Sequence, residues 1–287
     1  MPRYAYVNGA YVQHRDAAIH IEDRGYQFAD GVYEVATVAG GRLIDEEPHL
    51  DRLERSLAEL FIPMPMSRRA LQLVMRTLIS RNQVRNGMIY LQVTRGVAPR
   101  DHKFPAHVTP ALVMTTRRID FAAQEKFKKG VSVITIPDLR WARRDIKTIG
   151  LLPNCLGKQQ AFEAGAFEAW QVGADGFVTE GTSSNAWIVN AAGTLVTRHL
   201  SNDILHGVTR RTVLAIAREE ELAFEERPFT VAEAMAAREA FVTSATSFVT
   251  PVIRIDNTAI GDGRPGPLSQ RLLGWYRDYA EGLRVGA

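Results

Sequence analysis

The sequence predicts a mixed α and β protein (α+β) with two domains. Short runs rich in valine, isoleucine and aromatic residues alternate with segments whose leucines recur every three or four positions. The chain has 287 residues, of which 46% are hydrophobic, and this length suits one large globular domain or two modest ones. The stretch 118–130 is rich in charge and poor in large aliphatic residues, which favours a connection there. We expect an N-terminal domain over 1–117, a connection over 118–121 and a C-terminal domain over 122–287.

The N-terminal region predicts strands, then two helices, then two more strands. Asn8-Gly9 lies between two segments of aromatic residues and valine, which is typical of a β-hairpin. The segments 49–62 and 67–81 space their apolar residues like amphipathic helices, and Ser67 is a suitable cap for the second. Two strands of a half-buried sheet are expected at 88–96 and 111–119.

The C-terminal region continues to alternate between strands and helices. Helices are expected over Lys158–Ala164 and from Thr209 onward. Strands are expected at Val131–Ile136, 169–173, 176–180, 185–190, 239–245 and around Ile253. A G-x-G-x-x-G pattern ends at Gly266, but too little chain follows it for a βαβ unit of about 30 residues, so we interpret it as a turn.

Composition excludes several classes of protein. Lys and Arg number 35 against 32 Asp and Glu, an excess too small to indicate a polyanion-binding surface. The single cysteine cannot form an intramolecular disulfide, and the scattered histidines predict no metal site. The chain has no signal-peptide core and no apolar window of about 18 residues, so we expect a cytoplasmic protein without membrane or nucleic-acid partners. The arginines of RWARRD, at 140, 143 and 144, favour a loop near an anionic small molecule over a nucleic-acid patch.

Four segments carry candidate chemistry. Lys147 stands among aliphatic residues, so it either snorkels or is buried as the uncharged amine that a Schiff base requires. Arg100 and His102 are two apart in a polar loop and suit one carboxylate. TEGTSSN offers one acid beside small hydroxyl residues, and Thr209 lies at a helix start, where N–H groups attract phosphate.

Seven segments, in their order along the chain, resemble the class IV (fold-type IV) pyridoxal-phosphate aminotransferases, and within them the D-amino-acid aminotransferases. They are DRGYQFADGVYEV, HLDRL, RGVAPRDH, DIKTIGLLPN, GKQQAFEAGAFEA, VTEGTSSN and HGVTRR, within a resemblance that runs from about residue 4 to 254. The resemblance implies a smaller N-terminal two-layer αβ domain and a larger C-terminal αβ pseudo-barrel domain. It also implies that the cofactor, pyridoxal 5'-phosphate (PLP), binds between them.

The resemblance implies a role for each matched residue around the cofactor. Lys147 matches the lysine that holds PLP as a Schiff base and moves the substrate α-proton as general acid and base. Glu180 matches the acid that faces the pyridine nitrogen and keeps the ring protonated. Arg52 matches the arginine that binds the phosphate, aided by the N–H groups and hydroxyl at Val208 and Thr209.

Further matched positions lie beside the cofactor. Leu205 matches the apolar residue that packs on the ring face. A second phosphate-binding pair falls on Ser244 and Ala245, where alanine replaces the usual threonine and leaves only a backbone N–H as donor. The lost hydrogen bond is expected to cost about 1 kcal/mol. The small-residue turn beside the cofactor corresponds to Ser183, Ser184 and Asn185.

Substrate recognition is expected at Tyr33, Tyr90, Arg100 and His102. In the D-amino-acid enzymes the R-x-H pair traps the substrate α-carboxylate. Its loop comes from the other subunit, which implies an obligate homodimer with the active site at the subunit interface. Thr37 replaces a basic residue of some D-specific members, so D-alanine is expected ahead of D-glutamate.

The implied reaction is ping-pong transamination between a D-amino acid, D-alanine or D-glutamate, and a 2-oxo acid, pyruvate or 2-oxoglutarate. A branched-chain L-amino-acid aminotransferase, an (R)-amine aminotransferase and aminodeoxychorismate lyase share the fold and remain alternatives. A non-catalytic binding dimer that uses RWARRD as its surface is an alternative from another class. Failure to bind PLP would favour that last alternative.

Overall fold

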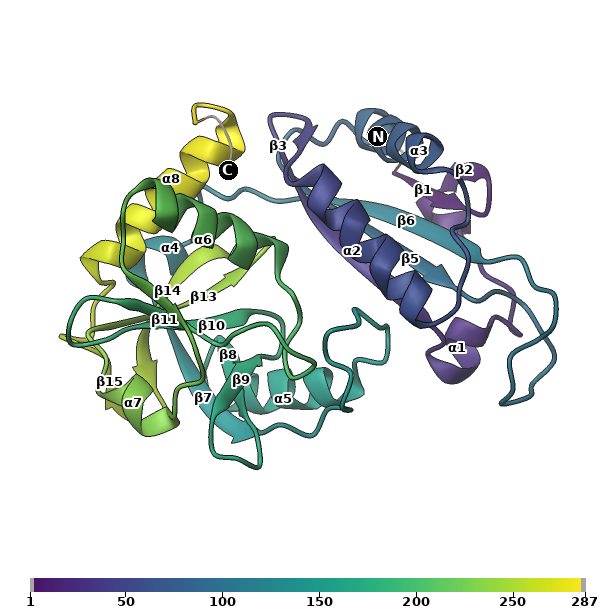
Figure 1. Ribbon diagram of the computed structural model, residues 1–287. Coiled ribbons are helices and arrows are strands. Elements are labelled where there is room, and N and C mark those ends of the chain that lie inside the picture. The colour runs from purple at the N-terminus through teal and green to yellow at the C-terminus, as the bar shows by residue number, and fades with distance from the viewer. Residues whose placement is uncertain (1–2, 285–287) are drawn as a thin grey trace. The chain divides into compact units, whose positions relative to one another are not determined.

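The computed structural model describes residues 3–284, drawn as the coloured ribbon in Figure 1. The chain divides into two compact units. Unit 1 comprises Met1–Phe121 with Ile146–Leu151, and unit 2 comprises Ala122–Asp145 with Leu152–Ala287. The segment Ile146–Leu151, which lies in the predicted domain 122–287, packs with unit 1. Residues 1–2 and 285–287 of the predicted domains lie outside the described residues.

Unit 1 is an antiparallel sheet with two long helices. The six strands lie in the order β2-β1-β6-β5-β3-β4. They are β1 Tyr4–Val7, β2 Ala10–Gln13, β3 Gly31–Ala39, β4 Arg42–Leu43, β5 Gly87–Thr94 and β6 Ala111–Arg118. The helices are α1 Arg24–Phe28, α2 Glu46–Glu59 and α3 Arg68–Arg81, with a 3-10 turn at His14–Asp16. Figure 1 shows α2 running along the sheet, where its leucine stripe is buried in the core of the unit.

Local sequence signals explain several of these elements. Asn8 and Gly9 have φ angles of 45° and 101°, as a two-residue hairpin turn requires, and they join β1 to β2. Ser67 caps α3, because its Oγ accepts a hydrogen bond from the Ala70 N–H at 3.3 Å. The hairpin, both amphipathic helices and the Ser67 cap are confirmed.

Two helices differ from the sequence-based expectation. Residues 24–28 form α1, where the sequence indicated only an approach to a strand; Asp23 caps this short helix by accepting from the Gly25 N–H at 2.8 Å. The predicted helix Lys158–Ala164 is α5 Leu152–Glu163, so its predicted start was wrong. Leu152, Leu156 and Phe162 are exposed on α5, so the helix lacks the apolar stripe that marks a start in sequence.

Unit 2 is built on one curled sheet of nine strands. Eight strands follow the order β12-β11-β10-β13-β14-β7-β8-β9, β15 pairs with β14, and β9 also contacts β10. The strands are β7 Val131–Pro137, β8 Glu168–Val172, β9 Val178–Gly181, β10 Asn185–Val189, β11 Leu195–Thr197, β12 Phe224–Glu226, β13 Glu239–Ser244, β14 Phe248–Ile255 and β15 Thr258–Ala259. The mixed α and β fold class is confirmed, since both units combine sheets with helices.

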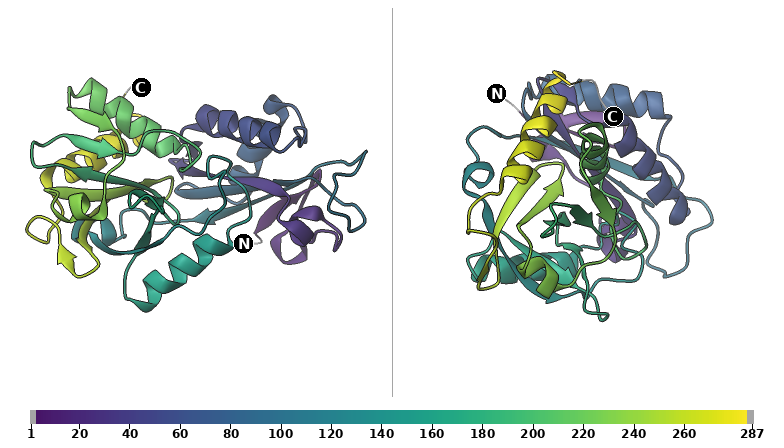
Figure 2. Two further views of the ribbon diagram at one scale, coloured as in Figure 1. Left: turned by 60° about the horizontal axis from the view of Figure 1, so that its bottom comes forward. Right: turned by 60° about the vertical axis from the view of Figure 1, so that its left-hand side comes forward.

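The helices of unit 2 pack on this sheet. They are α4 Lys126–Lys129, α5, α6 Val208–Glu219, α7 Val231–Met235 and α8 Pro267–Glu281. Helices α6 and α8 contact each other and β13, and α5, the teal helix in Figure 2, contacts β7 and β8. Gly261 and Gly263 have positive φ angles in a turn before α8, as expected. Within residues 3–284, no helix combines the length and apolar character that a membrane span requires.

Candidate active site

Lys147 lies in a short segment that pairs with β3. The Tyr33 N–H donates to the Lys147 carbonyl at 3.0 Å, and the Ile149 N–H donates to the Gly31 carbonyl at 3.1 Å. The lysine is half-buried, and its Nζ lies 4.2 Å from the centroid of the Tyr33 ring. Lys147 is therefore neither a fully exposed, snorkelling lysine nor a fully buried one. Its backbone is fixed by the strand pairing, and its amine lies against the face of an aromatic ring.

Tyr90 joins Tyr33 beside this lysine. The two rings come from neighbouring strands β3 and β5, and their centroids are 5.8 Å apart. The Tyr90 hydroxyl donates to Gln92 Oε1 at 2.7 Å. Burial, with a smaller contribution from Tyr33, raises the pKa of Tyr90 to about 12, so this phenol stays neutral at physiological pH. The predicted residues Tyr33, Tyr90 and Lys147 thus lie in one unit.

Arg52 is held by an acid that sequence reasoning missed. Its Nε and Nη2 donate to the two carboxylate oxygens of Glu34 at 2.7 Å each, and His49 Nδ1 lies 2.8 Å from Glu34 Oε2. Burial acts to raise the pKa of Glu34, but Arg52 and His49 outweigh it and lower the pKa to about 2. The spacing of His49 and Arg52, three residues apart on α2, was the available signal for a shared partner.

The loop between β5 and β6 carries Arg100 and His102, which are both exposed. The guanidinium carbon of Arg100 lies 4.5 Å from the centroid of the Phe28 ring, and the His102 ring centroid lies 5.4 Å from it. Phe28 belongs to the unpredicted helix α1. The structure therefore brings Arg100 and His102 to one aromatic side chain.

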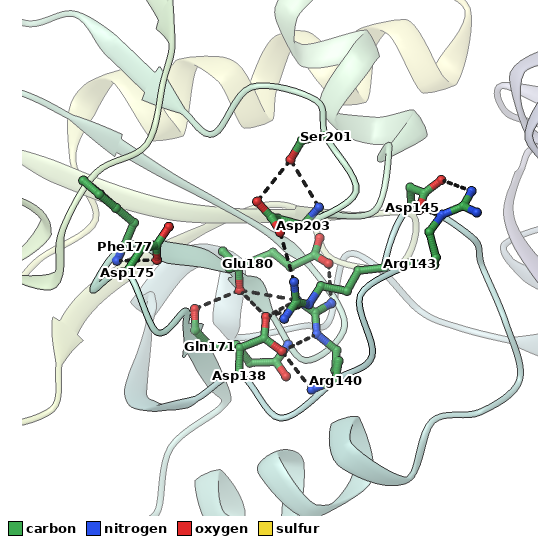
Figure 3. A network of polar contacts seen from close by, with 12 residues as sticks. Asp138, Arg140, Arg143, Asp145, Gln171, Asp175, Phe177, Glu180, Ser201 and Asp203 are labelled. Carbon is green, nitrogen blue, oxygen red and sulfur yellow. Dashed lines mark hydrogen bonds and ion pairs between the residues drawn. The ribbon is translucent and has the colours of Figure 1, made fainter.

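Glu180 is the buried acid of unit 2. Its carboxylate accepts hydrogen bonds from Arg140 Nη1, from Asn185 Nδ2 at 2.9 Å, and from the Leu205 N–H at 3.0 and 3.1 Å. Figure 3 shows Arg140 between Glu180 and Asp138. Arg140 Nη2 donates to Asp138 Oδ2 at 2.8 Å. Burial raises the pKa of Glu180 above its ordinary value despite the opposing Arg140 and Leu205 donors. The carboxyl is oriented by three groups yet retains affinity for a proton.

The arginines of RWARRD are matched by acids. Besides the pairing of Arg140, Arg143 lies 3.0 Å from Asp145, and Arg144 lies 3.1 Å from Asp203. These local ion pairs offset the positive charge that a nucleic-acid or scaffold surface would present. Sequence reasoning did not include Arg140 among the site residues. The aspartates at 138 and 145, which flank the three arginines, were the available signal.

A second buried acid, Glu168 on β8, fixes the small-residue turn. Ser183 Oγ and Ser184 Oγ donate to Glu168 Oε2 at 2.8 and 3.1 Å, and the Thr182 hydroxyl also hydrogen-bonds to this carboxylate. Sequence reasoning missed Glu168, because nothing local marks it as the partner of a turn 14 or more residues away. The predicted turn residues 183 and 184 are therefore anchored on a buried carboxyl group.

The start of α6 suits an anion. Gly207 is its N-cap, no described side chain caps it, and Val208 and Thr209 are buried in its first turn. A Cβ on Gly207 would lie 1.9 Å from Asn185 Oδ1, so this close approach requires glycine. The first-turn N–H groups and the helix dipole together attract phosphate.

The second predicted phosphate pair lies where β13 ends: Ser244 is the last residue of the strand, and Ala245 begins the turn to β14. Ser244 Oγ accepts from the Ser247 N–H at 3.2 Å, and Ala245 contributes backbone only. Elsewhere the residues present offer a half-buried amine, a buried carboxylate and an uncapped helix start. These groups fit an aldehyde, a pyridine nitrogen and a phosphate, so the donor set suits pyridoxal phosphate. Among residues 3–284, no cluster of three potential metal ligands occurs.

The chain is similar to characterised aminotransferases over nearly its whole length. The family model for amino-transferase class IV matches residues 31–255. D-alanine aminotransferase from Bacillus licheniformis is 44% identical over 265 residues, which are 92% of this chain and 93% of that protein. D-alanine aminotransferase from Staphylococcus haemolyticus is 36% identical over 96% of this chain and 97% of that protein.

Solved structures share the fold. Branched-chain amino acid aminotransferase from Escherichia coli has a TM-score of 0.91 at 21% identity and covers 98% of this chain and 96% of its own. The branched-chain amino acid aminotransferase from Thermobaculum terrenum in its PLP form has a TM-score of 0.85 at 23% identity. The match covers 99% of this chain and 95% of that one. The expected fold type IV and the expected cofactor are thereby confirmed. This chain belongs to the class IV aminotransferase family, whose members depend on pyridoxal phosphate.

Proposed function

We propose that this aminotransferase exchanges the amino group of a D-amino acid, D-alanine ahead of D-glutamate, with the oxo group of pyruvate or 2-oxoglutarate. The observation that carries the proposal is the convergence of Arg100 and His102 on Phe28 in a chain 44% identical to a D-alanine aminotransferase. A guanidinium beside an imidazole suits the carboxylate that both substrates contain. The two half-reactions follow one another in ping-pong order.

Bound PLP supplies the electron sink for the electron pair left when the substrate Cα loses its proton. Lys147 Nζ would hold the cofactor, and as a free amine this nitrogen would accept the substrate α-proton and return it. Pairing with β3 fixes the Lys147 backbone, and this limits the positions that the amine can take during the reaction. Tyr33 and Tyr90 lie beside it and exclude water from this side of the substrate.

Glu180 would hold a proton at the pyridine nitrogen of bound PLP. A carboxyl whose pKa is raised by burial shares a proton with that nitrogen more readily than an ordinary glutamate does. Arg140, Asn185 and the Leu205 N–H orient its oxygens. The Leu205 side chain would pack on the ring face. Ser183 and Ser184, anchored on Glu168, form the turn beside the ring.

The phosphate is held by charge and by N–H groups. Arg52, fixed by Glu34, contributes a guanidinium, and Val208 and Thr209 contribute the start of α6. Ser244 adds a hydroxyl and Ala245 a backbone N–H. The protein works as a cytoplasmic homodimer in which the loop carrying Arg100 and His102 serves the partner's active site.

The test is the visible spectrum of the PLP-loaded protein during stepwise addition of D-alanine, and of L-alanine to a fresh sample. We expect the band of the lysine-bound cofactor to disappear with the D isomer only and to return on adding pyruvate or 2-oxoglutarate. A band that responds instead to branched-chain L-amino acids, or to an amine without a carboxylate, would overturn the D-amino-acid assignment. Failure of the protein to bind PLP would overturn the assignment of aminotransferase activity.

A further inference from the structure

One buried arginine holds three successive carbonyl groups of the loop that carries Arg100 and His102. Arg24 Nη1 donates to the Asp101 carbonyl at 2.6 Å and to the Lys103 carbonyl at 3.4 Å, and Nη2 donates to the His102 carbonyl at 3.5 Å. Arg24 is only 3% exposed, whereas the side chains of the loop it holds are exposed. A guanidinium presents several N–H donors in a rigid plane, so it fixes the backbone path of this stretch.

Arg24 is itself fixed to the body of unit 1. Its Nε donates to Asp30 Oδ2 at 2.7 Å, and Arg95 Nε donates to the same oxygen at 2.7 Å. Arg95 continues the network to the Leu60 carbonyl at 2.8 Å. Burial acts to raise the pKa of Asp30, but the hydrogen bonds from Arg95 and Arg24 outweigh it, so this acid stays ionised. The carbonyl contacts therefore rest on a rigid ion network.

Helix α1 is likewise fixed to the sheet. Asp23 accepts from the Gly25 N–H through Oδ1 at 2.8 Å and from the Thr94 hydroxyl through Oδ2 at 2.9 Å. A Cβ on Gly25 would lie 2.2 Å from the Thr94 side chain, so the helix start lies directly on β5. The platform beneath the loop is thus part of the sheet framework.

Phe28 fixes the side chains that the carbonyl contacts leave free to rotate. The guanidinium carbons of Arg24 and Arg100 lie 4.8 and 4.5 Å from its ring centroid, and the His102 ring lies 5.4 Å away. A cation within about 6 Å of an aromatic face is attracted to it. One ring therefore contacts both predicted carboxylate-binding side chains and the arginine that holds their backbone.

We propose that Arg24 and Phe28 are positioning residues that form the α-carboxylate site before substrate arrives, Arg24 through the loop backbone and Phe28 through the side chains of Arg100 and His102. This inference rests on the proposed function for the identity of the bound group. Ordering flexible side chains costs binding free energy, and a site already ordered avoids that cost. Loss of either residue therefore weakens the binding of substrates with an α-carboxylate and leaves cofactor binding unchanged.

The kinetic test uses the PLP-loaded enzyme with Phe28→Leu and Arg24→Lys. Phe28→Leu removes the aromatic face, and Arg24→Lys keeps the charge beside Asp30 without the planar set of donors. We expect KM for D-alanine to rise about 10-fold with kcat changed less than about threefold, and Arg100→Ala to set the upper limit of the effect. Phe28→Tyr should restore KM. Tyr26→Leu is the matched control, because Tyr26 lies on the same helix and is 73% exposed.

Two further readouts separate positioning from general damage. The affinity for PLP, followed by its visible absorbance, should match the wild type. The rate of the single half-reaction with isopropylamine, measured without any 2-oxo acid, should match as well, because neither measurement involves an α-carboxylate. An unchanged KM for D-alanine, or an equal loss with the carboxylate-free amine, would overturn the inference.

Trypsin cleavage after Arg100 and Lys103 tests the loop independently of the substrate assignment. We expect cleavage about 10-fold faster in Phe28→Leu and Arg24→Lys than in the Tyr26→Leu control. Faster cleavage in an enzyme that ignores D-alanine would mean that the proposed function is wrong and the anchoring correct. Equal cleavage rates would overturn the anchoring even in an active D-amino-acid aminotransferase.

Discussion

Glu34 of unit 1 and Glu180 of unit 2 are both buried beside an arginine, yet their proton affinities move in opposite directions. Glu34 accepts hydrogen bonds from Nε and Nη2 of Arg52 and contacts His49, and its pKa falls to about 2. Glu180 shares Arg140 with Asp138, whose negative charge adds to burial, and the pKa of Glu180 rises. An acid with its own arginine is a structural anion, whereas an acid that must share one keeps the proton affinity that chemistry requires.

The largest expected effect comes from removing the acid suited to chemistry. Glu180→Gln keeps the size of the side chain but cannot share a proton with the pyridine nitrogen as a carboxylate does. We expect kcat to fall about 10²–10³-fold, with KM for D-alanine changed far less. Steady-state kinetics on PLP-saturated enzyme measures this. A variant with nearly normal kcat would mean that Glu180 resembles Glu34 in being structural.

Removing the structural anion should cost stability. Glu34→Gln leaves Arg52 buried without its counter-ion, and we expect the free energy of unfolding to fall by about 3 kcal/mol. Urea unfolding at pH 7 measures this. Glu59→Gln, at the end of the helix α2 that carries Arg52, is a suitable control because Glu59 is not buried. A loss no larger than the control's would contradict the pairing.

The two acids should also give opposite dependences of stability on pH. The pKa of Glu34 is lowered from 4.5 to about 2 in the folded protein, so its stabilisation is complete above pH 4.5 and is lost as the pH falls toward 2. The pKa of Glu180 is raised above 4.5, so its contribution is complete below pH 4.5 and is lost as the pH rises through the folded pKa. Unfolding free energies of both glutamine variants, measured from pH 3 to 8 and subtracted from the wild type, should slope in opposite directions. Parallel slopes would remove the distinction.

The smallest expected effect sharpens the comparison. Asp138→Asn removes the negative charge that shares Arg140 with Glu180, so the pKa of Glu180 should fall toward that of Glu34. We expect kcat to change by about threefold. We also expect the midpoint of the pH-dependent change in the visible spectrum to move to lower pH. Asp175→Asn is the control, since Asp175 is exposed and pairs with Arg198, which is not a partner of Asp138. Identical profiles in both variants would show that Asp138 does not influence Glu180.

Sequence patterns predicted the elements whose signals are local. The Asn8-Gly9 turn, the leucine stripe of α2 and the Ser67 cap each depend on neighbours a few residues away. Helix α1 is too short to show a period, and α5 leaves Leu152 and Leu156 exposed, so neither has the periodic signal that the prediction needs.

The candidate site could be predicted only as separate residues. Lys147, Glu180 and Arg100 stand in motifs that resemble a family, and their roles follow from that resemblance. Their partners do not, because Glu34 meets Arg52 across 18 positions and Arg140 meets Glu180 across 40. Such pairings depend on strand order and on which residues share a buried face, and no local pattern in one sequence encodes these.

The segment Ile146–Leu151 belongs to unit 1, while the chain on both sides of it belongs to unit 2. The polypeptide therefore passes from one unit to the other three times. A gene fragment that begins at residue 122 would encode Lys147 but not β3, the strand that fixes its backbone. The two units are consequently not interchangeable modules: recombination at a single junction cannot transfer unit 2 to another protein without detaching this lysine from the sheet that holds it.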